Sequence, residues 1–119
     1  MIYSITPVPK PRMTRRDKWL NPPRLCVAQY RAFKDEVRLA KINIPDCNAR
    51  IYFFIPIPKS WSRQKQQEMV WKPHQQTPDI DNYLKALMDA IFDDDSHVWD
   101  IRPTKIWAKE GAIEILYGK

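Results

Sequence analysis

Glycine is scarce in this sequence, with only 2 residues in 119, and cysteine and histidine are equally rare, with 2 residues each. So few glycines exclude a glycine-rich phosphate-binding loop, which needs several residues with positive φ. Cys26 and Cys47 are too few for a disulfide scaffold and lack the paired spacing of a zinc site, so we expect reduced thiols. No apolar run approaches the roughly 20 residues of a membrane span, and the first residues lack a signal-peptide pattern. We therefore expect a soluble, cytoplasmic protein with no membrane partner.

Proline, in contrast, occurs 11 times, so the irregular segments should be extended and stiff. Hydrophobic residues make up 44% of the chain and aromatic residues 12%, which is enough for one hydrophobic core. A chain of this length has the usual size of one domain. We therefore treat residues 1–119 as a single domain.

The charges are distributed unevenly around a formal net charge of +6. Residues 1–34 carry eight basic side chains against the single carboxylate of Asp17. Residues 79–100 carry seven aspartates against the single cation of Lys85. A basic surface of this kind favours a polyanionic partner such as nucleic acid.

The aspartate-rich segment has two interpretations. Runs of like charge are usually solvated surface, which makes an exposed acidic turn the simpler one. The other is a site for Mg²⁺ or Mn²⁺, because both ions prefer hard oxygen ligands such as carboxylates. A divalent ion surrounded by lysine and arginine would complete a surface that binds and cleaves phosphodiesters.

Apolar periodicity predicts an α+β domain, in which a mixed sheet of about four strands packs with two to three helices. The expected strands are Ile2–Thr6, Arg50–Ile57, Val98–Ala108 and Ala112–Tyr117. The expected helices are Val27–Lys41, a short polar helix capped by Ser60 and ending near Val70, and Asp81–Phe92. Nearly continuous apolar residues over 50–57 predict a central strand buried on both faces. The connection at residues 109–111 predicts that the last two strands form a hairpin.

The helix expected over residues 81–92 lies between groups of acidic residues. Asp79 comes just before it, and Asp81 stands at its N-cap position, near amides that stabilise negative charge. Lys85 follows Asp81 by one turn. If the turn at residues 93–95 folds back, a third carboxylate can join this pair. Such a trio could bind one or two divalent ions that activate water for phosphodiester hydrolysis.

The chain resembles the RusA family of Holliday junction resolvases, which includes many phage and prophage enzymes. The resemblance rests on Pro73-His74, on the D-x-D-N-x-x-K motif within residues 78–85, on Asp89-Ala90 and on residues 94–96. It implies a homodimeric, Mg²⁺-dependent endonuclease of bacterial or phage origin that nicks four-way DNA junctions symmetrically, with Mn²⁺ as a substitute. The metal-binding aspartates of the family fall on Asp79, Asp81 and Asp95, and its functional lysine falls on Lys85. The connection after Ala90 is shorter than in relatives, which leaves Asp93, Asp94 and Asp95 open as the third ligand.

For DNA contact we expect the basic segment, which should become ordered on DNA. The expected contacts are Lys10, Arg12, Arg15, Arg16, Lys18 and Lys72. Trp19 is the best candidate for stacking on an exposed base. We interpret Asp89 as structural, and His74 and His97 as ordinary polar residues without a catalytic role. Two alternatives remain: a non-catalytic DNA-binding protein with a solvated acidic turn, and a nuclease of broader specificity for branched DNA.

Overall fold

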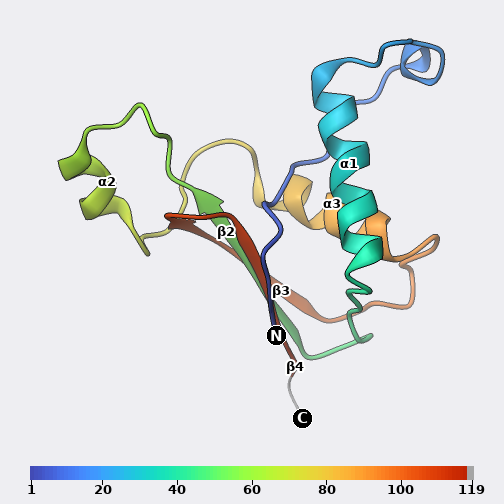
Figure 1. Ribbon diagram of the computed structural model, residues 1–119. Helices are drawn as coiled ribbons and strands as arrows, with labels where there is room; N and C mark the ends of the chain where they lie inside the picture. The colour runs from blue at the N-terminus through green and yellow to red at the C-terminus, as the bar shows by residue number, and fades with distance from the viewer. Residues whose placement is uncertain (118–119) are drawn as a thin grey trace.

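Four strands form one mixed sheet in the order β1–β4–β2–β3 (Figure 1). In this computed structural model, which describes residues 1–117, they are β1 (Ile2–Tyr3), β2 (Ala49–Pro56), β3 (Ile101–Ala108) and β4 (Ala112–Tyr117). β2 pairs in parallel with β3 and antiparallel with β4, while β1 pairs antiparallel with β4. The predicted α+β class with a four-stranded mixed sheet is therefore confirmed. The last two residues of the predicted domain, 118 and 119, lie outside the described range.

The predicted hairpin between the last two strands is wrong, because β2 lies between β3 and β4. Ile51 at the middle of β2 pairs with Pro103 on one side and with Ile115 on the other. The most apolar strand takes the central position, where both of its edges are covered. Residues 109–111 therefore cross the end of β2 and do not form a local turn.

Gly111 in this crossing packs tightly against the N-terminal segment. A Cβ atom at this position would lie 2.5 Å from Thr6 Oγ1 and 2.8 Å from Thr6 Cα. Such distances are shorter than van der Waals contact. Only glycine therefore fits where the β3–β4 connection meets residue 6.

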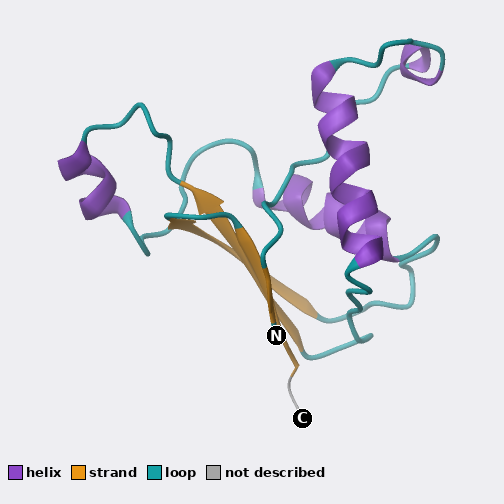
Figure 2. Ribbon diagram, viewed as in Figure 1, coloured by secondary structure: helices purple, strands orange, loops and turns teal. Residues whose placement is uncertain are grey.

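Helices cover one face of the sheet (Figure 2). α1 (Leu25–Leu39) and α3 (Ile80–Ile91) pack together on this face, whereas the short α2 (Arg63–Met69) projects beyond the end of β2. One hydrophobic cluster joins α1 and α3 to the sheet. It includes Phe33 of α1, Leu87 of α3 and Phe53 of β2, each at most 2% exposed. Among residues 1–117, no helix has the length and apolar character needed to cross a membrane.

β2 is fully buried only on the side that faces the helices, so the predicted burial of both faces is wrong. Its residues alternate between buried and half-buried along the strand. The half-buried side carries Tyr52 and Phe54, whose rings stack at 6.2 Å. Both major helices lie on the opposite face, so this side of the sheet keeps contact with solvent.

Local hydrogen bonds shift several predicted boundaries. Ser62, and not Ser60, caps α2, because its Oγ accepts a hydrogen bond from the Lys65 amide at 3.1 Å. β1 ends at Tyr3, since the Ile5 amide turns back to the Tyr3 carbonyl at 2.8 Å. α1 begins and ends two residues earlier than expected, which leaves its buried face unchanged.

Candidate active site

The N-terminus of α3 presents two of the predicted catalytic carboxylates. Asp79, and not Asp81, is the N-cap residue, because the Asn82 amide already donates a hydrogen bond to the Asp79 carbonyl at 3.1 Å. The Asp79 side chain makes no capping hydrogen bond, although an aspartate here commonly does. Asp81 lies in the first turn, and both residues are exposed. Both carboxylates are therefore accessible to a ligand in solution.

Lys85 lies beside this acidic pair. Its Nζ atom is 3.7 Å from Asp81 Oδ2, and the two side chains are 63% and 62% exposed. Such an exposed pair between residues four apart contributes little to stability, about 0.3–0.5 kcal/mol. The structure thus brings Asp79, Asp81 and Lys85 together, and the lysine can exchange its partner for a phosphate at little cost.

A second lysine at this site, Lys105 of β3, was not predicted from the sequence. Its Nζ atom donates hydrogen bonds to the carbonyls of Gln76 and Pro78, at 2.8 and 2.9 Å. Burial lowers the pKa of Lys105, while the charge of Asp79 acts in the opposite direction. Lys105 lies opposite the buried Phe53 of β2 and so faces the helices, but the pairing of β2 with β3 that places it there was not predicted from the sequence.

The third predicted carboxylate lies at the other end of α3. The helix has 12 residues, which corresponds to about 18 Å. The turn that follows carries exposed aspartates at positions 93–95. In it, the Ser96 amide donates to Asp94 Oδ1 at 2.9 Å, which lowers the pKa of Asp94.

This acidic turn folds onto residues 46–48 and not back along α3. His97 Nδ1 lies 2.6 Å from Asp46 Oδ1, and the Trp99 amide donates to the Asp46 carbonyl. The amides of residues 99 and 100 bond the Asp46 carbonyl, and pairing with β2 begins only at Ile101, so β3 starts later than predicted. Within residues 1–117, no three histidine, cysteine, aspartate or glutamate side chains converge as a metal site. A single chain in this conformation presents the acidic pair without Asp95.

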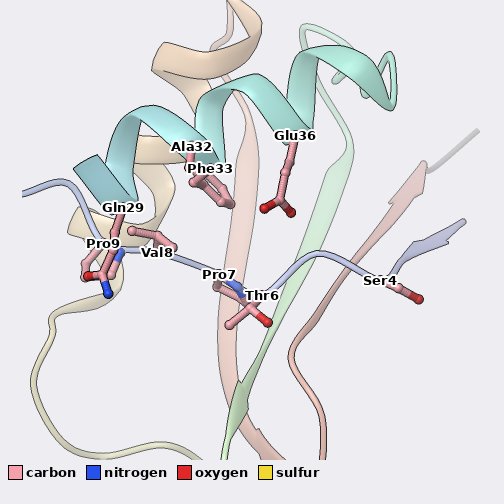
Figure 3. A pocket seen from close by; sticks show the side chains of 9 residues that line it. All are labelled: Ser4, Thr6, Pro7, Val8, Pro9, Gln29, Ala32, Phe33 and Glu36. Atoms are coloured by element: carbon pink, nitrogen blue, oxygen red, sulfur yellow. The ribbon is translucent and has the colours of Figure 1, made fainter. Parts of the chain in front are cut away.

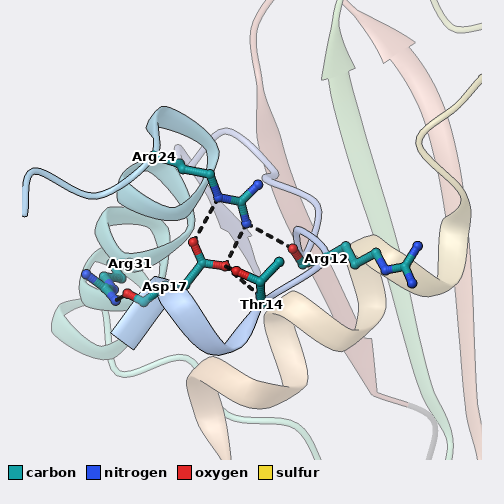
Figure 4. A network of polar contacts seen from close by, with 5 residues as sticks. All are labelled: Arg12, Thr14, Asp17, Arg24 and Arg31. Carbon is teal, nitrogen blue, oxygen red and sulfur yellow. Dashed lines mark hydrogen bonds and ion pairs between the residues drawn. The ribbon is translucent and has the colours of Figure 1, made fainter. Parts of the chain in front are cut away.

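The basic N-terminal segment folds around one buried carboxylate (Figure 4). Asp17, in a short 3₁₀-helix (η1, Arg15–Lys18), is only 1% exposed. Arg24 donates to both of its carboxylate oxygens, at 2.8 and 2.7 Å, and the Thr14 amide donates at 2.6 Å. The hydrogen bond from Arg24 holds the pKa of Asp17 well below its ordinary value. These contacts give the segment a folded arrangement around the Asp17 carboxylate; its ordering on DNA stays a prediction.

Most of the side chains predicted to contact DNA are exposed around this hydrogen-bond network. Arg24 also bonds the Arg12 carbonyl, and Arg31 bonds the Asp17 carbonyl. The exposed side chains around it are Arg12, Arg15, Arg16, Lys18 and the 84% exposed Trp19. We call residues 12–19 the basic lobe. It forms a compact cationic surface with an exposed aromatic ring.

Lys10 and Lys72, also predicted to contact DNA, lie apart from the basic lobe. Lys10 Nζ is 2.6 Å from Asp89 Oδ2, and the Lys10 amide donates to the Asn82 carbonyl at 3.0 Å. Its charge is therefore compensated within the protein. Lys72 is exposed and follows α2, where its carbonyl accepts a hydrogen bond from the Trp107 amide. The main-chain bond of Lys10 connects the segment just before the basic lobe to the first turn of α3.

Asp89 has structural surroundings, as predicted, and His74 is buried. Asp89 accepts hydrogen bonds from Lys10 and from the Tyr30 hydroxyl, and although burial would raise its pKa, these bonds lower it overall. His74 is 5% exposed, and its ring lies 4.3 Å from that of Trp107. Burial, together with the charge of Lys105, lowers the pKa of His74. Both effects favour the neutral imidazole, whose ring packs against that of Trp107.

A hollow of about 470 Å³ lies between the N-terminal segment and α1 (Figure 3). Its lining includes Thr6, Pro7, Phe33 and Glu36. None of the predicted site residues lines it. We therefore place the candidate active site at the N-terminus of α3.

Comparison with known proteins identifies the family. The uncharacterized protein YqaN of Bacillus subtilis (strain 168) is 34% identical over 70 residues, which cover 51% of this chain and 49% of YqaN. The chain thus spans about half the length of this curated relative. No solved structure gives a significant match. Residues 3–116 match the sequence profile described as endodeoxyribonuclease RusA, so the chain belongs to the RusA endodeoxyribonuclease family.

Proposed function

We propose that this protein is a metal-dependent endodeoxyribonuclease that resolves four-way DNA junctions by paired, symmetric nicks during recombination. The observation that carries the proposal is the pair of exposed carboxylates at the N-terminus of α3, next to Lys85, in a chain of the RusA family. The basic lobe supports DNA as the partner, because its exposed cations have the charge needed to contact phosphates.

Mg²⁺, with Mn²⁺ as a substitute, is the proposed cofactor. Carboxylate oxygens suit these ions, and Asp79 keeps its carboxylate free of the usual capping bond. When bound, the ion supplies a hydroxide nucleophile from water at neutral pH and neutralises charge on the phosphate. The residues of the chain have separate roles: Asp79 and Asp81 hold and orient the cation, and Lys85 stabilises negative charge on the cleaved phosphate.

A homodimer is the proposed functional unit, because two symmetric cuts need two active sites related by a two-fold axis.

We keep Asp95 as the third ligand and propose that each chain supplies it to the site of the other. The support is the separation of Asp95 from Asp79 and Asp81 by the length of α3. Mixing an Asp81→Asn chain with an Asp95→Asn chain tests this arrangement. Mixed dimers contain one intact site if Asp95 acts across the dimer, so strand nicking returns. They contain none if Asp95 acts within its own chain, and the mixture then stays inactive.

Cleavage of synthetic DNA tests the proposed activity. We compare a four-way junction, a flap and a linear duplex, in Mg²⁺ and in EDTA, with wild type, Asp81→Asn and Asp35→Asn. The last variant removes another exposed carboxylate, on α1, and serves as the matched control. Junction cleavage that needs Mg²⁺ and Asp81 but not Asp35 supports the proposal. Binding without cleavage in any divalent metal supports a non-catalytic DNA-binding protein, and equal cleavage of the flap supports a broader nuclease.

A further inference from the structure

We infer that Lys105 is a positioning residue of the active site, which holds the segment before α3 so that Asp79 is presented in one fixed orientation. This role depends on the proposed function, because it concerns the same acidic pair. Lys105 differs from Lys85 in its surroundings. Lys85 is exposed and next to a carboxylate, whereas Lys105 is half-buried and bonded to main-chain carbonyls.

Both the main chain and the side chain of Lys105 hold this segment. The His74 amide donates a hydrogen bond to the Lys105 carbonyl at 3.1 Å, and Pro73 forms an isolated antiparallel β-bridge with Ile106. The Lys105 ammonium then reaches forward along the segment to the carbonyls of Gln76 and Pro78. Residues 73–78 are thereby fastened to β3 at both ends.

The bond to Pro78 acts directly on Asp79. The Pro78 carbonyl and the Asp79 amide belong to one planar peptide unit, so fixing this carbonyl fixes the plane from which the Asp79 Cα projects. The Asp79 side chain makes no capping bond that could orient it instead. The direction of this carboxylate therefore depends on the main chain before it, and that main chain depends on Lys105.

The number of donors also favours positioning over direct phosphate contact. An ammonium group has three N–H donors, and the two carbonyls of this segment occupy two of them. Leaving those carbonyls for a phosphate would release the segment that carries Asp79. Lys85, with no carbonyl to hold, is the better placed of the two for the DNA.

The Mg²⁺ dependence of junction cleavage tests this role. We compare wild type, Lys105→Met, Lys105→Arg and Lys109→Met, the last an exposed lysine just after β3 that serves as the control. Loss of a group that orients a metal ligand typically weakens metal binding 10- to 100-fold. The Mg²⁺ concentration for half-maximal cleavage should therefore rise about 10-fold or more in Lys105→Met. It should recover partly in Lys105→Arg and stay unchanged in Lys109→Met.

Two other roles of Lys105 give different results. If only its charge mattered, removing a cation near the acidic pair would tighten Mg²⁺ binding and lower this concentration. If Lys105 only stabilised the fold, the maximal rate would fall while the Mg²⁺ midpoint stayed unchanged. Either result would overturn the inference.

Hydrogen exchange, measured without metal or DNA, separates this inference from the proposed function. Amides in residues 73–82 should exchange faster in Lys105→Met than in wild type, while amides in β4 should not change. If Lys105→Met does not fold, Lys105→Gln, which keeps a donor, takes its place. A wild type that cleaves no junction would refute the proposed function, and exchange would still decide whether Lys105 holds the segment. Unchanged exchange in residues 73–82 would overturn the inference even if wild type cleaves junctions.

Discussion

Asp89 connects three parts of the molecule, and its removal should destabilise the fold. Its Oδ2 atom accepts hydrogen bonds from Lys10 of the N-terminal segment, at 2.6 Å, and from Tyr30 of α1, at 3.0 Å. Tyr30 is only 4% exposed, so Asp89→Ala leaves a buried hydroxyl without this acceptor. An unsatisfied buried polar group costs about 1–3 kcal/mol, and the partly exposed ion pair with Lys10 adds about 0.2–1 kcal/mol. We expect the free energy of unfolding to fall by about 2–3 kcal/mol.

Urea unfolding of four proteins measures this effect: wild type, Asp89→Ala, Tyr30→Phe and the double variant. Tyr30→Phe alone removes one hydrogen bond and should cost about 0.5–1.5 kcal/mol. In the Tyr30→Phe background no hydroxyl is left unpaired, so Asp89→Ala should then cost only about 1 kcal/mol or less. The two substitutions should therefore be coupled by about 1 kcal/mol or more.

The coupling is the decisive quantity in this experiment. Lys10→Met removes the ion pair but leaves the Tyr30–Asp89 bond, and it should change stability by less than about 1 kcal/mol. Equal effects of Asp89→Ala in the two backgrounds would refute the account of the Tyr30 hydroxyl. A total effect below about 0.5 kcal/mol, the size of an ordinary surface substitution, would refute the structural role of Asp89.

Three further predictions concern the basic lobe and the close contact at Gly111. Because Arg24 depresses the pKa of Asp17, the ionised carboxylate stabilises the fold fully above its ordinary pKa of 3.8, and this stabilisation is lost as pH falls below that value. In urea unfolding at a series of pH values, Asp17→Asn should therefore make the free energy of unfolding fall less steeply at acid pH than in wild type. The same acid dependence in both proteins would contradict this role of Asp17. Gly111→Ala should lower the free energy of unfolding by about 1–3 kcal/mol, since its Cβ would overlap Thr6, whereas wild-type stability would contradict this packing. Arg15 and Arg16 should each contact one DNA phosphate. Replacing both by glutamine should make the slope of log binding constant against log salt concentration, measured by fluorescence anisotropy with a four-way junction, less steep by nearly 2. An unchanged slope would exclude both arginines as phosphate contacts.

Local sequence patterns predicted the elements of this fold better than their pairing. The apolar stripe of α3 and the β-branched run of β2 depend on residues close in sequence, and both were predicted nearly to their ends. The position of β2 between β3 and β4 depends on contacts across half the chain. The short connection between β3 and β4 therefore suggested a hairpin, but β2 lies between these two strands.

The candidate site was predictable to a similar extent. The spacing of Asp79, Asp81 and Lys85 is local, and the structure places these side chains together at one helix end. The roles of Asp17 and Lys105 are not local, because each depends on partners that only the folded chain brings near. One aspartate among eight cations was visible in the sequence as a charge, but its burial and its function as the centre of the lobe were not.

Cleavage of a supercoiled plasmid that extrudes a cruciform tests the central claim most directly. Two symmetric nicks within the lifetime of one complex convert the plasmid to a linear product, whereas a single nick gives an open circle. We predict that wild type gives linear plasmid in Mg²⁺ and no product in EDTA, and that Asp81→Asn gives neither product. Open circle as the lasting main product of wild type would contradict paired cleavage, and intact plasmid in Mg²⁺ and in Mn²⁺ would contradict the proposed activity itself.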